Sequence, residues 1–173
     1  FELILHQTGR SIDTPSTGIS GIPIFQAYQM DGTFLWEISL GRNIREGAHY
    51  TQFMVYDLDG DGISEFAFKT ADGAIDGIGK VIGDSTKEWR NLDKTSGPFY
   101  GKILDGPEYF TIFSGSNGAA LATVNYIPDR YPLNGWNGHG GNGGGDSTGN
   151  RVDRMLACVA YLDGIHPSVV MCR

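Results

Sequence analysis

The chain has 173 residues, which is enough for one domain with a hydrophobic core of its own. Its net charge of −7 argues against nucleic acid and anionic membranes as partners, because both bind basic surfaces. An acidic ligand remains compatible with this charge if bound calcium and local arginines reverse the field. The sequence also contains no continuous apolar run long enough for a membrane-spanning helix.

Glycine content and alternating apolar residues predict an all-β chain. The 26 glycines are about twice the usual share of ~7%, which indicates short strands joined by tight turns. A strand is expected at residues 1–5, and hairpins are expected around Asp-Gly and Asn-Gly turns, which favour tight reversals. The four hairpins are expected at 22–41, 51–70, 108–127 and 154–172.

Two hairpins in succession form a unit that recurs once along the chain. The first two expected hairpins are followed by a second, similar pair after a long connection. Four-stranded sheets repeated radially are the plan of the β-propeller, and the chain suffices for about two such sheets. The connections at 72–107 and 127–150 are long, which is typical of functional loops.

The stretch "YDLDGDGISE", residues 56–65, crowds acidic residues into a tight loop between two expected strands. Carboxylates this close repel one another, and a hard cation with oxygen ligands would offset the repulsion. The EF-hand pattern does not apply, because it needs an acidic residue at the twelfth position of the loop, and counting from Asp57 that position is Phe68. The alternative is a solvated acidic turn without metal. The expected calcium ligands are the carboxylates of Asp57, Asp59, Asp61 and Glu65 and the carbonyl of Ile63, with Gly62 at the sharp turn.

Two further features of the last hairpin follow from its residue types. Its turn at Asp163-Gly164 corresponds to Asp61-Gly62 but lacks the other acids, so it is expected to keep the turn and lose the metal. Cys158 and Cys172 show no metal-binding spacing and are expected to be free thiols buried among apolar residues. A disulfide is the alternative.

Several long motifs resemble a known enzyme family. They include "AYQMDGTFLWEISLGRNIREGAHYTQFMVYDLDGDG", "GPEYFTIFSGSNGAALATV" and "LDGIHPSVVM". Together they are similar to polysaccharide lyase family 11, the rhamnogalacturonan lyases, and the resemblance spans essentially the whole chain. It implies that residues 1–173 form a single partial region, about two blades at the start, of a calcium-stabilised eight-bladed β-propeller.

The resemblance also implies a function. The whole enzyme would cleave the rhamnogalacturonan I backbone of pectin, an acidic polysaccharide, by calcium-assisted β-elimination, and it would be secreted or periplasmic. The chain's other partner would be the remainder of its own propeller, and this fragment alone would be inactive. The alternative is a non-catalytic calcium-binding propeller fragment or a carbohydrate-binding module.

β-Elimination needs a base for the C5 proton, a cation for the C6 carboxylate and a proton for the leaving oxygen. His49 and Lys69 are the candidate bases. The alternatives are a packing histidine and a salt-bridged lysine. A further alternative is a base supplied by the remainder of the propeller.

Candidate sugar contacts lie in three segments beside the expected strands. Arg45 and Arg151 are candidate carboxylate partners, because a guanidinium matches a carboxylate bidentately. The alternatives are a solvated charge for Arg45 and an Arg-Asp network for Arg151. Trp36 is expected in the core, whereas Trp136 is the candidate for stacking on a sugar ring. The full set of expected substrate contacts is Arg45, Gln52, Asp72, Trp136, Asn150 and Arg151, of which Asp72 is also a candidate second calcium ligand.

Overall fold

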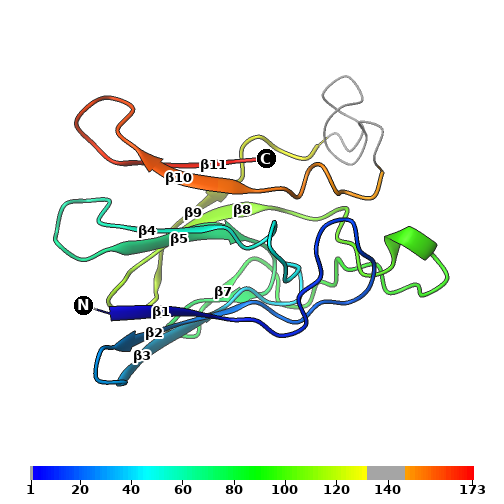
Figure 1. The fold of residues 1–173 in the computed structure, drawn as a ribbon, viewed down its shortest axis with the longest axis horizontal. Coiled ribbons are helices and arrows are strands. Elements are labelled where there is room, and N and C mark those ends of the chain that lie inside the picture. Colours follow the sequence, from blue (N-terminus) through cyan, green and yellow to red (C-terminus); the bar gives the residue numbers. More distant parts are fainter. Residues whose placement is uncertain (1, 132–146) are drawn as a thin grey trace.

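The computed structural model describes residues 2–131 and 147–173, and in these ranges the chain consists almost entirely of strands and loops (Figure 1). The one helical element described is the short 3₁₀ helix η1 (Gly97–Phe99), so no described helix could cross a membrane. In chain order the strands are β1 (Glu2–Gln7), β2 (Ile24–Gln29), β3 (Phe34–Ser39), β4 (Phe53–Tyr56), β5 (Glu65–Thr70), β6 (Ala74–Ile75), β7 (Val81–Ile82), β8 (Tyr109–Phe113), β9 (Ala120–Asn125), β10 (Leu156–Ala160) and β11 (Ser168–Cys172).

The strands form three antiparallel sheets. The first has the order β1-β2-β3-β6-β7, the second has the order β4-β5-β8-β9, and the third contains β10 and β11. None of these sheets closes on itself within the described ranges. The expected first strand and the four expected hairpins are therefore confirmed, but the described strands make three sheets rather than two.

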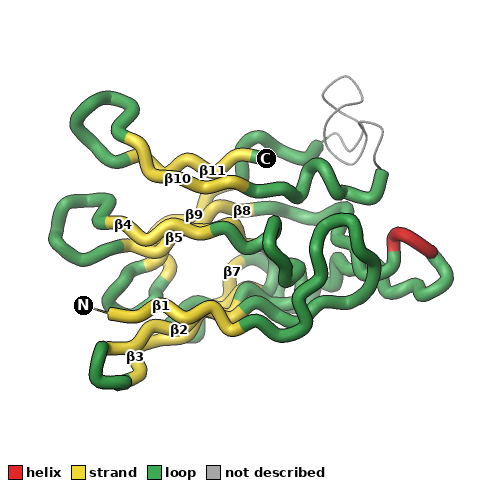
Figure 2. Tube along the Cα trace, viewed as in Figure 1, coloured by secondary structure: helices red, strands yellow, loops and turns green. Residues whose placement is uncertain are grey.

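Most strands lie roughly along one axis and alternate in direction, so the loops gather at the two ends of the sheets. The hairpin turns lie at one end, on the left of the view, and the long connections lie at the other (Figures 1 and 2). The residues immediately before β4 and the loop immediately after it are therefore at opposite ends of the molecule. This arrangement separates two groups of candidate site residues.

The sheets divide the chain differently from the predicted repeat. The repeat groups the β2–β3 hairpin with the β4–β5 hairpin, whereas β5 pairs with β8, from Phe66↔Phe113 to Thr70↔Tyr109. The connection between β5 and β8 also adds β6 and β7 to the first sheet, next to β3. The four-stranded unit therefore begins with the hairpin that contains the acidic loop, and the predicted repeat is offset by one hairpin.

Aromatic side chains fill the space between the first two sheets. Phe25 on β2 packs against Phe66 and Phe68 on β5, with ring centroids 5.1 Å apart in both pairs. Phe68 in turn stacks on Phe113 of β8 at 4.8 Å. Trp36 is buried in this core, as expected. Burying one such side chain contributes roughly 1.5–3 kcal/mol, so this aromatic layer holds the two sheets together.

Strand β5 is buried along its whole length, because both of its faces are covered. The two-residue period of a strand places Phe66 and Phe68 on the face toward the first sheet. The same period places Glu65 and Lys69 on the opposite face, toward the segments that flank β10 and β11. Two charged residues thus enter the interior from a strand that is otherwise uncharged.

The two cysteines are free, as expected, but both are exposed. They lie in the β10–β11 ladder, where Cys158 is opposite Val170 and Cys172 is opposite Leu156. The predicted burial is wrong, because the pairing places both thiols on the same face of this two-stranded sheet as Leu156, and that face is exposed.

Candidate functional site

The acidic loop between β4 and β5 keeps its three aspartates together. One carboxylate oxygen from each of Asp57, Asp59 and Asp61 lies within 4.8 Å of the other two. Asp57 is half-buried, and the other two are exposed. Three carboxylates at this spacing, open to solvent, suit a hard divalent cation such as calcium.

Main-chain N–H groups hold these carboxylates in place. Asp57 accepts hydrogen bonds from the N–H groups of Gly60 at 2.8 Å and Gly62 at 3.0 Å. Asp61 accepts one from Ile63 N at 2.7 Å. Gly62 has a φ of +90°, which is the left-handed conformation expected at the sharp turn. The backbone of the loop therefore directs the carboxylates toward one another despite their charge.

The two other expected calcium ligands are placed differently. Glu65 is only 6% exposed, and its Oε2 accepts a hydrogen bond from Leu58 N at 2.8 Å. It lies outside the group formed by the three aspartates. Ile63 lies in the loop with its side chain exposed. Calcium binding by these two residues stays a prediction.

The β10–β11 turn is the counterpart of the acidic loop in the third sheet. Gly164 has a φ of +79°, similar to that of Gly62, so the turn itself is kept. Asp163 accepts hydrogen bonds from the main-chain N–H and from Nδ1 of His166, both at 2.7 Å. These bonds lower the pKa of Asp163 to about 2. The two turns thus share a backbone shape but differ in their side-chain chemistry.

His49 precedes β4 and so lies at the other end of the sheets, where it contacts Asp13. Its Nδ1 is hydrogen-bonded to Asp13 Oδ1. Its carbonyl oxygen accepts a hydrogen bond from Met155 N at 3.0 Å, which ties this segment to the start of β10. The hydrogen bond with His49, aided by the nearby charge of Arg154, lowers the pKa of the Asp13 carboxyl against the opposing effect of its desolvation.

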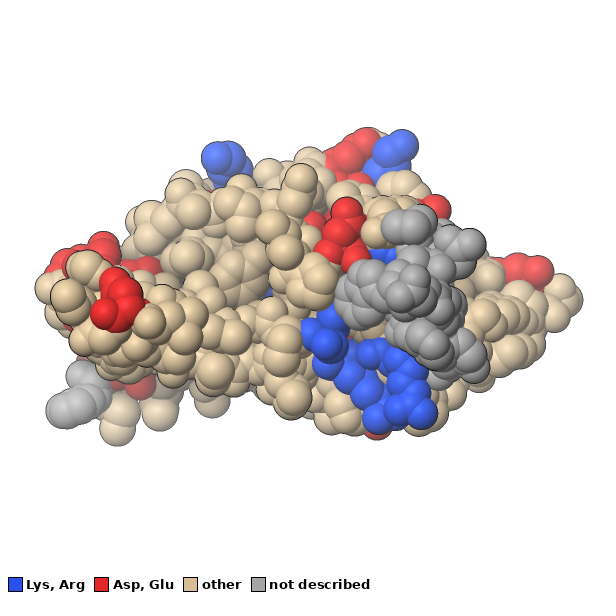
Figure 3. Space-filling view, turned by 90° about the horizontal axis from the view of Figure 1, so that it is seen from above, with Lys and Arg blue, Asp and Glu red and all other residues tan. Residues whose placement is uncertain are grey.

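The segment before β10 presents two arginines beside this pair. Arg151 and Arg154 are exposed, whereas Asp153 between them is buried. Arg154 donates from Nη2 to Asn150 Oδ1 at 3.0 Å and from Nε to the Asn150 carbonyl at 3.1 Å. Lys and Arg side chains gather on one part of the face that contains β10 and β11 (Figure 3). The structure thus joins the segments of three expected site residues, His49, Asn150 and Arg151.

Arg45 and Gln52 make contacts within the protein. Arg45 is 2% exposed, contacts the hydroxyl of Tyr50 and lines a cavity of about 20 Å³, which has room for about one water molecule. Gln52 donates from Nε2 to the Ala48 carbonyl at 2.7 Å. Sugar contacts by these two residues stay predictions. Trp136 lies outside the described residues.

Asp72 is also turned into the protein. It is 4% exposed, and its carboxylate accepts hydrogen bonds from Trp89 Nε1 and from Asp84 N, both at 2.9 Å. Its carbonyl accepts another from Asn43 Nδ2 at 2.9 Å. These bonds fix the long connection after β5 onto the end of that strand. A role for Asp72 in binding calcium or sugar stays a prediction.

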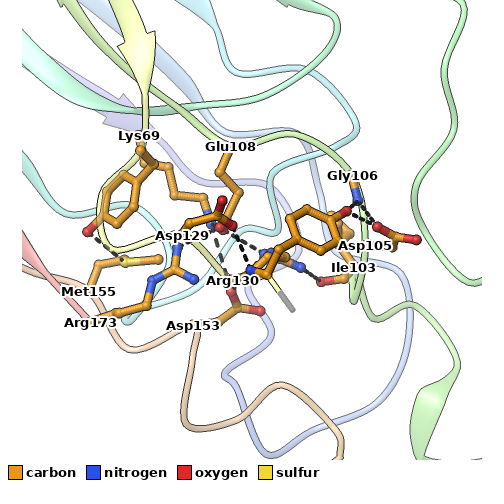
Figure 4. A network of polar contacts seen from close by, with 12 residues as sticks. Lys69, Ile103, Asp105, Gly106, Glu108, Asp129, Arg130, Asp153, Met155 and Arg173 are labelled. Atoms are coloured by element: carbon orange, nitrogen blue, oxygen red, sulfur yellow. Dashed lines mark hydrogen bonds and ion pairs between the residues drawn. The ribbon is translucent and has the colours of Figure 1, made fainter. Parts of the chain in front are cut away.

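Lys69 belongs to a buried cluster of charges (Figure 4). Its Nζ lies 2.7 Å from Glu108 Oε1 and 3.8 Å from Asp153 Oδ1. Arg130 Nη2 lies 2.6 Å from the same Glu108 oxygen and 3.3 Å from Asp153 Oδ1. Arg173 Nη2 lies 2.6 Å from Glu108 Oε2. The cluster connects β5 to the segments before β8, after β9, before β10 and after β11.

The cations of the cluster favour the ionised form of the Glu108 carboxyl. Burial alone would raise the pKa of the Glu108 carboxyl, but Lys69, Arg130 and Arg173 hold it well below its usual range. Lys69 is engaged in ion pairs, so the alternative of a salt-bridged lysine describes what the structure contains. Its role as a base stays a prediction.

The functional candidates that sequence reasoning missed are those without a local motif. Asp13 stands in the stretch "SIDTPSTG", where nothing marks it as a partner of His49. Glu108 and Arg130 border β8 and β9 and read as ordinary strand-end charges. Arg154 stands three residues after the predicted site residue Arg151, and the sequence has no feature that favours Arg154 over Arg151.

Comparison with known proteins gives consistent matches over the whole chain. Residues 1–173 match the family model described as "Rhamnogalacturonan lyase family 11, C-terminal domain". Two curated proteins of Bacillus subtilis (strain 168) match over 174 residues: rhamnogalacturonan exolyase YesX at 53% identity and rhamnogalacturonan endolyase YesW at 52%. The chain is covered completely in both matches and spans 26% of each relative, about a quarter of its length.

Solved structures match in the same way. The crystal structure of the exotype rhamnogalacturonan lyase YesX aligns with a TM-score of 0.86 and 53% identity, over 98% of this chain and 26% of that one. The rhamnogalacturonan lyase PL11 of Bacillus licheniformis aligns with the same TM-score and identity, over 98% of this chain and 27% of that one.

Proposed function

Because this chain belongs to rhamnogalacturonan lyase family 11, we propose that the protein containing it cleaves the rhamnogalacturonan I backbone of pectin by β-elimination. The observation that supports this most is the 53% and 52% identity, over the whole chain, to an exolyase and an endolyase of this substrate class. The near-equal identities favour neither mode of cleavage. Because pectin is an extracellular polymer, we place the protein outside the cytoplasm, secreted or periplasmic.

We further propose that the second sheet is one blade of an eight-bladed propeller. Its strands follow the order β4-β5-β8-β9, an antiparallel four-stranded arrangement suited to a blade. The first and third sheets would belong to the blades on either side. The remainder of the propeller, supplied by the rest of the protein, would cover the strands left open here.

Of the two predicted bases, His49 suits the reaction better than Lys69. Its imidazole is half-exposed and can meet a polymeric substrate, whereas Lys69 is buried and engaged by Glu108. Arg151 and Arg154 stand in the neighbouring segment and would face the uronate carboxylate, whose neutralisation makes the C5 proton more acidic. This end of the sheets therefore offers both a base and cations.

We assign the acidic loop a structural calcium ion. Asp57, Asp59 and Asp61 would hold it, and the bound charge would relieve the repulsion among them. The loop follows β4 whereas His49 precedes it, so this ion would be remote from the proposed base. Its contribution would be to stiffen the β4–β5 hairpin rather than to neutralise the substrate.

Calcium should therefore stabilise the protein through this loop. Saturating calcium should raise the melting temperature of the wild type, and Asp59→Ala should reduce this gain. Calcium at 100 times its Kd for one site stabilises the folded protein by roughly 2.7 kcal/mol. Asp163→Ala, in the counterpart turn, is the matched control and should keep the full gain. Equal calcium-dependent shifts in the wild type and in Asp59→Ala would count against the site.

The lyase reaction itself can be tested with the whole protein. Incubation with rhamnogalacturonan I should produce ultraviolet absorbance from the C4=C5 double bond of the new non-reducing end. His49→Ala should lower kcat by about 10²–10⁴-fold, the usual contribution of a general base. A neutral polysaccharide is the control substrate. Release of reducing ends without new absorbance would indicate hydrolysis and would overturn the proposal.

A further inference from the structure

His49 and Asp13 form a pair whose geometry is suited to general base catalysis. The Asp13 carboxylate engages Nδ1 of the imidazole. No hydrogen bond to Nε2 is formed by any residue in the described ranges. We propose that Asp13 is a positioning residue, which holds the His49 imidazole with Nε2 free to remove the C5 proton of a galacturonosyl residue, an inference that rests on the proposed lyase function.

The main chain brings the two residues together from distant parts of the sequence. Ile12 N donates to the Glu46 carbonyl at 2.8 Å, which fixes the loop before β2 against the segment that contains His49. Asp13 is held in turn by Thr14 N, which donates to its Oδ1 at 2.8 Å. The contact between the two side chains therefore rests on a defined backbone arrangement.

The pair is accessible, unlike the buried charge cluster that contains Lys69. The His49 and Asp13 side chains are 38% and 44% exposed, whereas that of Lys69 is 8% exposed. A polymer chain needs such access, because the reacting atoms must come within hydrogen-bond reach of the base. Because both side chains lie at the surface, a substrate can reach Nε2 without entering a deep pocket.

The charges around the pair come from three segments. Arg154 lies close enough to favour ionised Asp13. Tyr50, the residue after His49, interacts with Arg45 and Asp153. Its pKa is raised by burial first and then by Asp153. Asp13 is thus the carboxylate that contacts the imidazole directly, and Arg154 is a cation available to a substrate carboxylate.

The proposed step balances as an elimination. Nε2 of His49 takes the C5 proton, and the electron pair of the C5–H bond forms the C4=C5 double bond. The C4–O bond breaks, and the leaving oxygen takes a proton from water. Nδ1 keeps its proton throughout, and the Asp13 carboxylate stabilises the imidazolium that forms on proton transfer, as in other His–carboxylate pairs.

The test is Asp13→Asn in the whole protein, with Asp163→Asn as the matched control. Asp163 makes the same kind of contact with His166, at 2.7 Å, in an exposed turn at the other end of the sheets. Asp13→Asn should lower kcat by about 10- to 100-fold, part of the ~10²–10⁴-fold that a general base supplies. KM should stay near the wild-type value, because Arg151 and Arg154 are retained, and Asp13→Glu should recover part of kcat because it restores a carboxylate. Asp163→Asn should change neither quantity.

A second measurement separates this inference from the proposed function. Diethylpyrocarbonate modifies unprotonated imidazole nitrogens, so its rate at each histidine, followed by mass spectrometry at one fixed pH, reports how that imidazole is held. Asp13→Asn should change the modification rate of His49 and leave that of His166 unchanged. An unchanged modification rate at His49, or a wild-type kcat in Asp13→Asn, would overturn the inference. Absence of lyase activity in the wild type would overturn the proposed function, and the modification rates would then decide the pairing alone.

Discussion

Residues 1–173 expressed alone will release little or no unsaturated product from rhamnogalacturonan I, whereas the whole protein will cleave it. The chain spans about a quarter of the lyases that it matches, at 26% of their length. The segment before β10 is tied to β10–β11, and a two-stranded sheet is only marginally stable by itself. Loss of order there would displace Arg151 and Arg154 from His49. We expect a fall of more than about 10²-fold, since positioning alone contributes that much to catalysis.

Exposed apolar side chains support the same expectation. Strands β1, β4 and β9 end their sheets in the described structure, and such edges invite association. The exposed apolar residues on the strands of this chain include Leu3, Leu5, Leu121, Val124 and Leu156. Size-exclusion chromatography beside the absorbance assay would distinguish an aggregated fragment from a folded, inactive one. Robust turnover by a monomeric fragment would refute the prediction and would place base, proton donor and carboxylate partner within these residues.

Local sequence patterns were sufficient to predict most of the strands of this chain. The two-residue period and the Gly-containing turns locate β2–β3, β4–β5, β8–β9 and β10–β11, because turn chemistry and side-chain alternation act over a few residues. The assignment of strands to sheets depends on pairing between distant segments. β6 and β7 have two residues each, which is too short to show side-chain alternation, so the sequence did not predict that they extend the first sheet beyond β3.

The same distinction applies to the candidate sites. The aspartates at 57, 59 and 61 meet because they alternate within one tight loop, so the sequence predicted their grouping. The contact of His49 with Asp13 joins the β1–β2 connection to the β3–β4 connection, and neither segment has a motif that predicts contact with the other. Lys69 alternates with Phe66 and Phe68, but only the packing of the third sheet shows that its face of β5 is buried.

Replacement of Glu108 by Gln will destabilise the protein more than any change to a surface charge. The variant leaves Lys69, Arg130 and Arg173 buried around a single carboxylate, that of Asp153. Removal of one partner from a buried ion cluster costs roughly 3–5 kcal/mol, because the remaining charges lose their compensation. Urea denaturation of the whole protein would measure the loss in the free energy of unfolding.

The matched control is Glu88→Gln. Glu88 pairs with Arg90 at 2.6 Å, a distance similar to those around Glu108, but the two side chains are 27% and 22% exposed. Solvent screens this pair, so its loss should cost no more than about 1 kcal/mol. Equal losses for the two variants would show that the buried cluster has no special importance for stability.

The pH dependence of the Glu108 effect follows from the sign of its pKa shift. The folded protein holds the pKa of this carboxyl well below its usual value of 4.5. The unfolded chain therefore binds a proton before the folded protein does, and the free energy of unfolding falls as the pH drops below that value. The stabilisation is complete above pH 4.5 and disappears as the pH falls through the folded pKa. The difference in unfolding free energy between the wild type and Glu108→Gln should accordingly be largest near neutral pH and shrink in acid. A difference that stays constant from neutral to strongly acidic pH would mean that Glu108 stabilises the fold through packing and not through its charge.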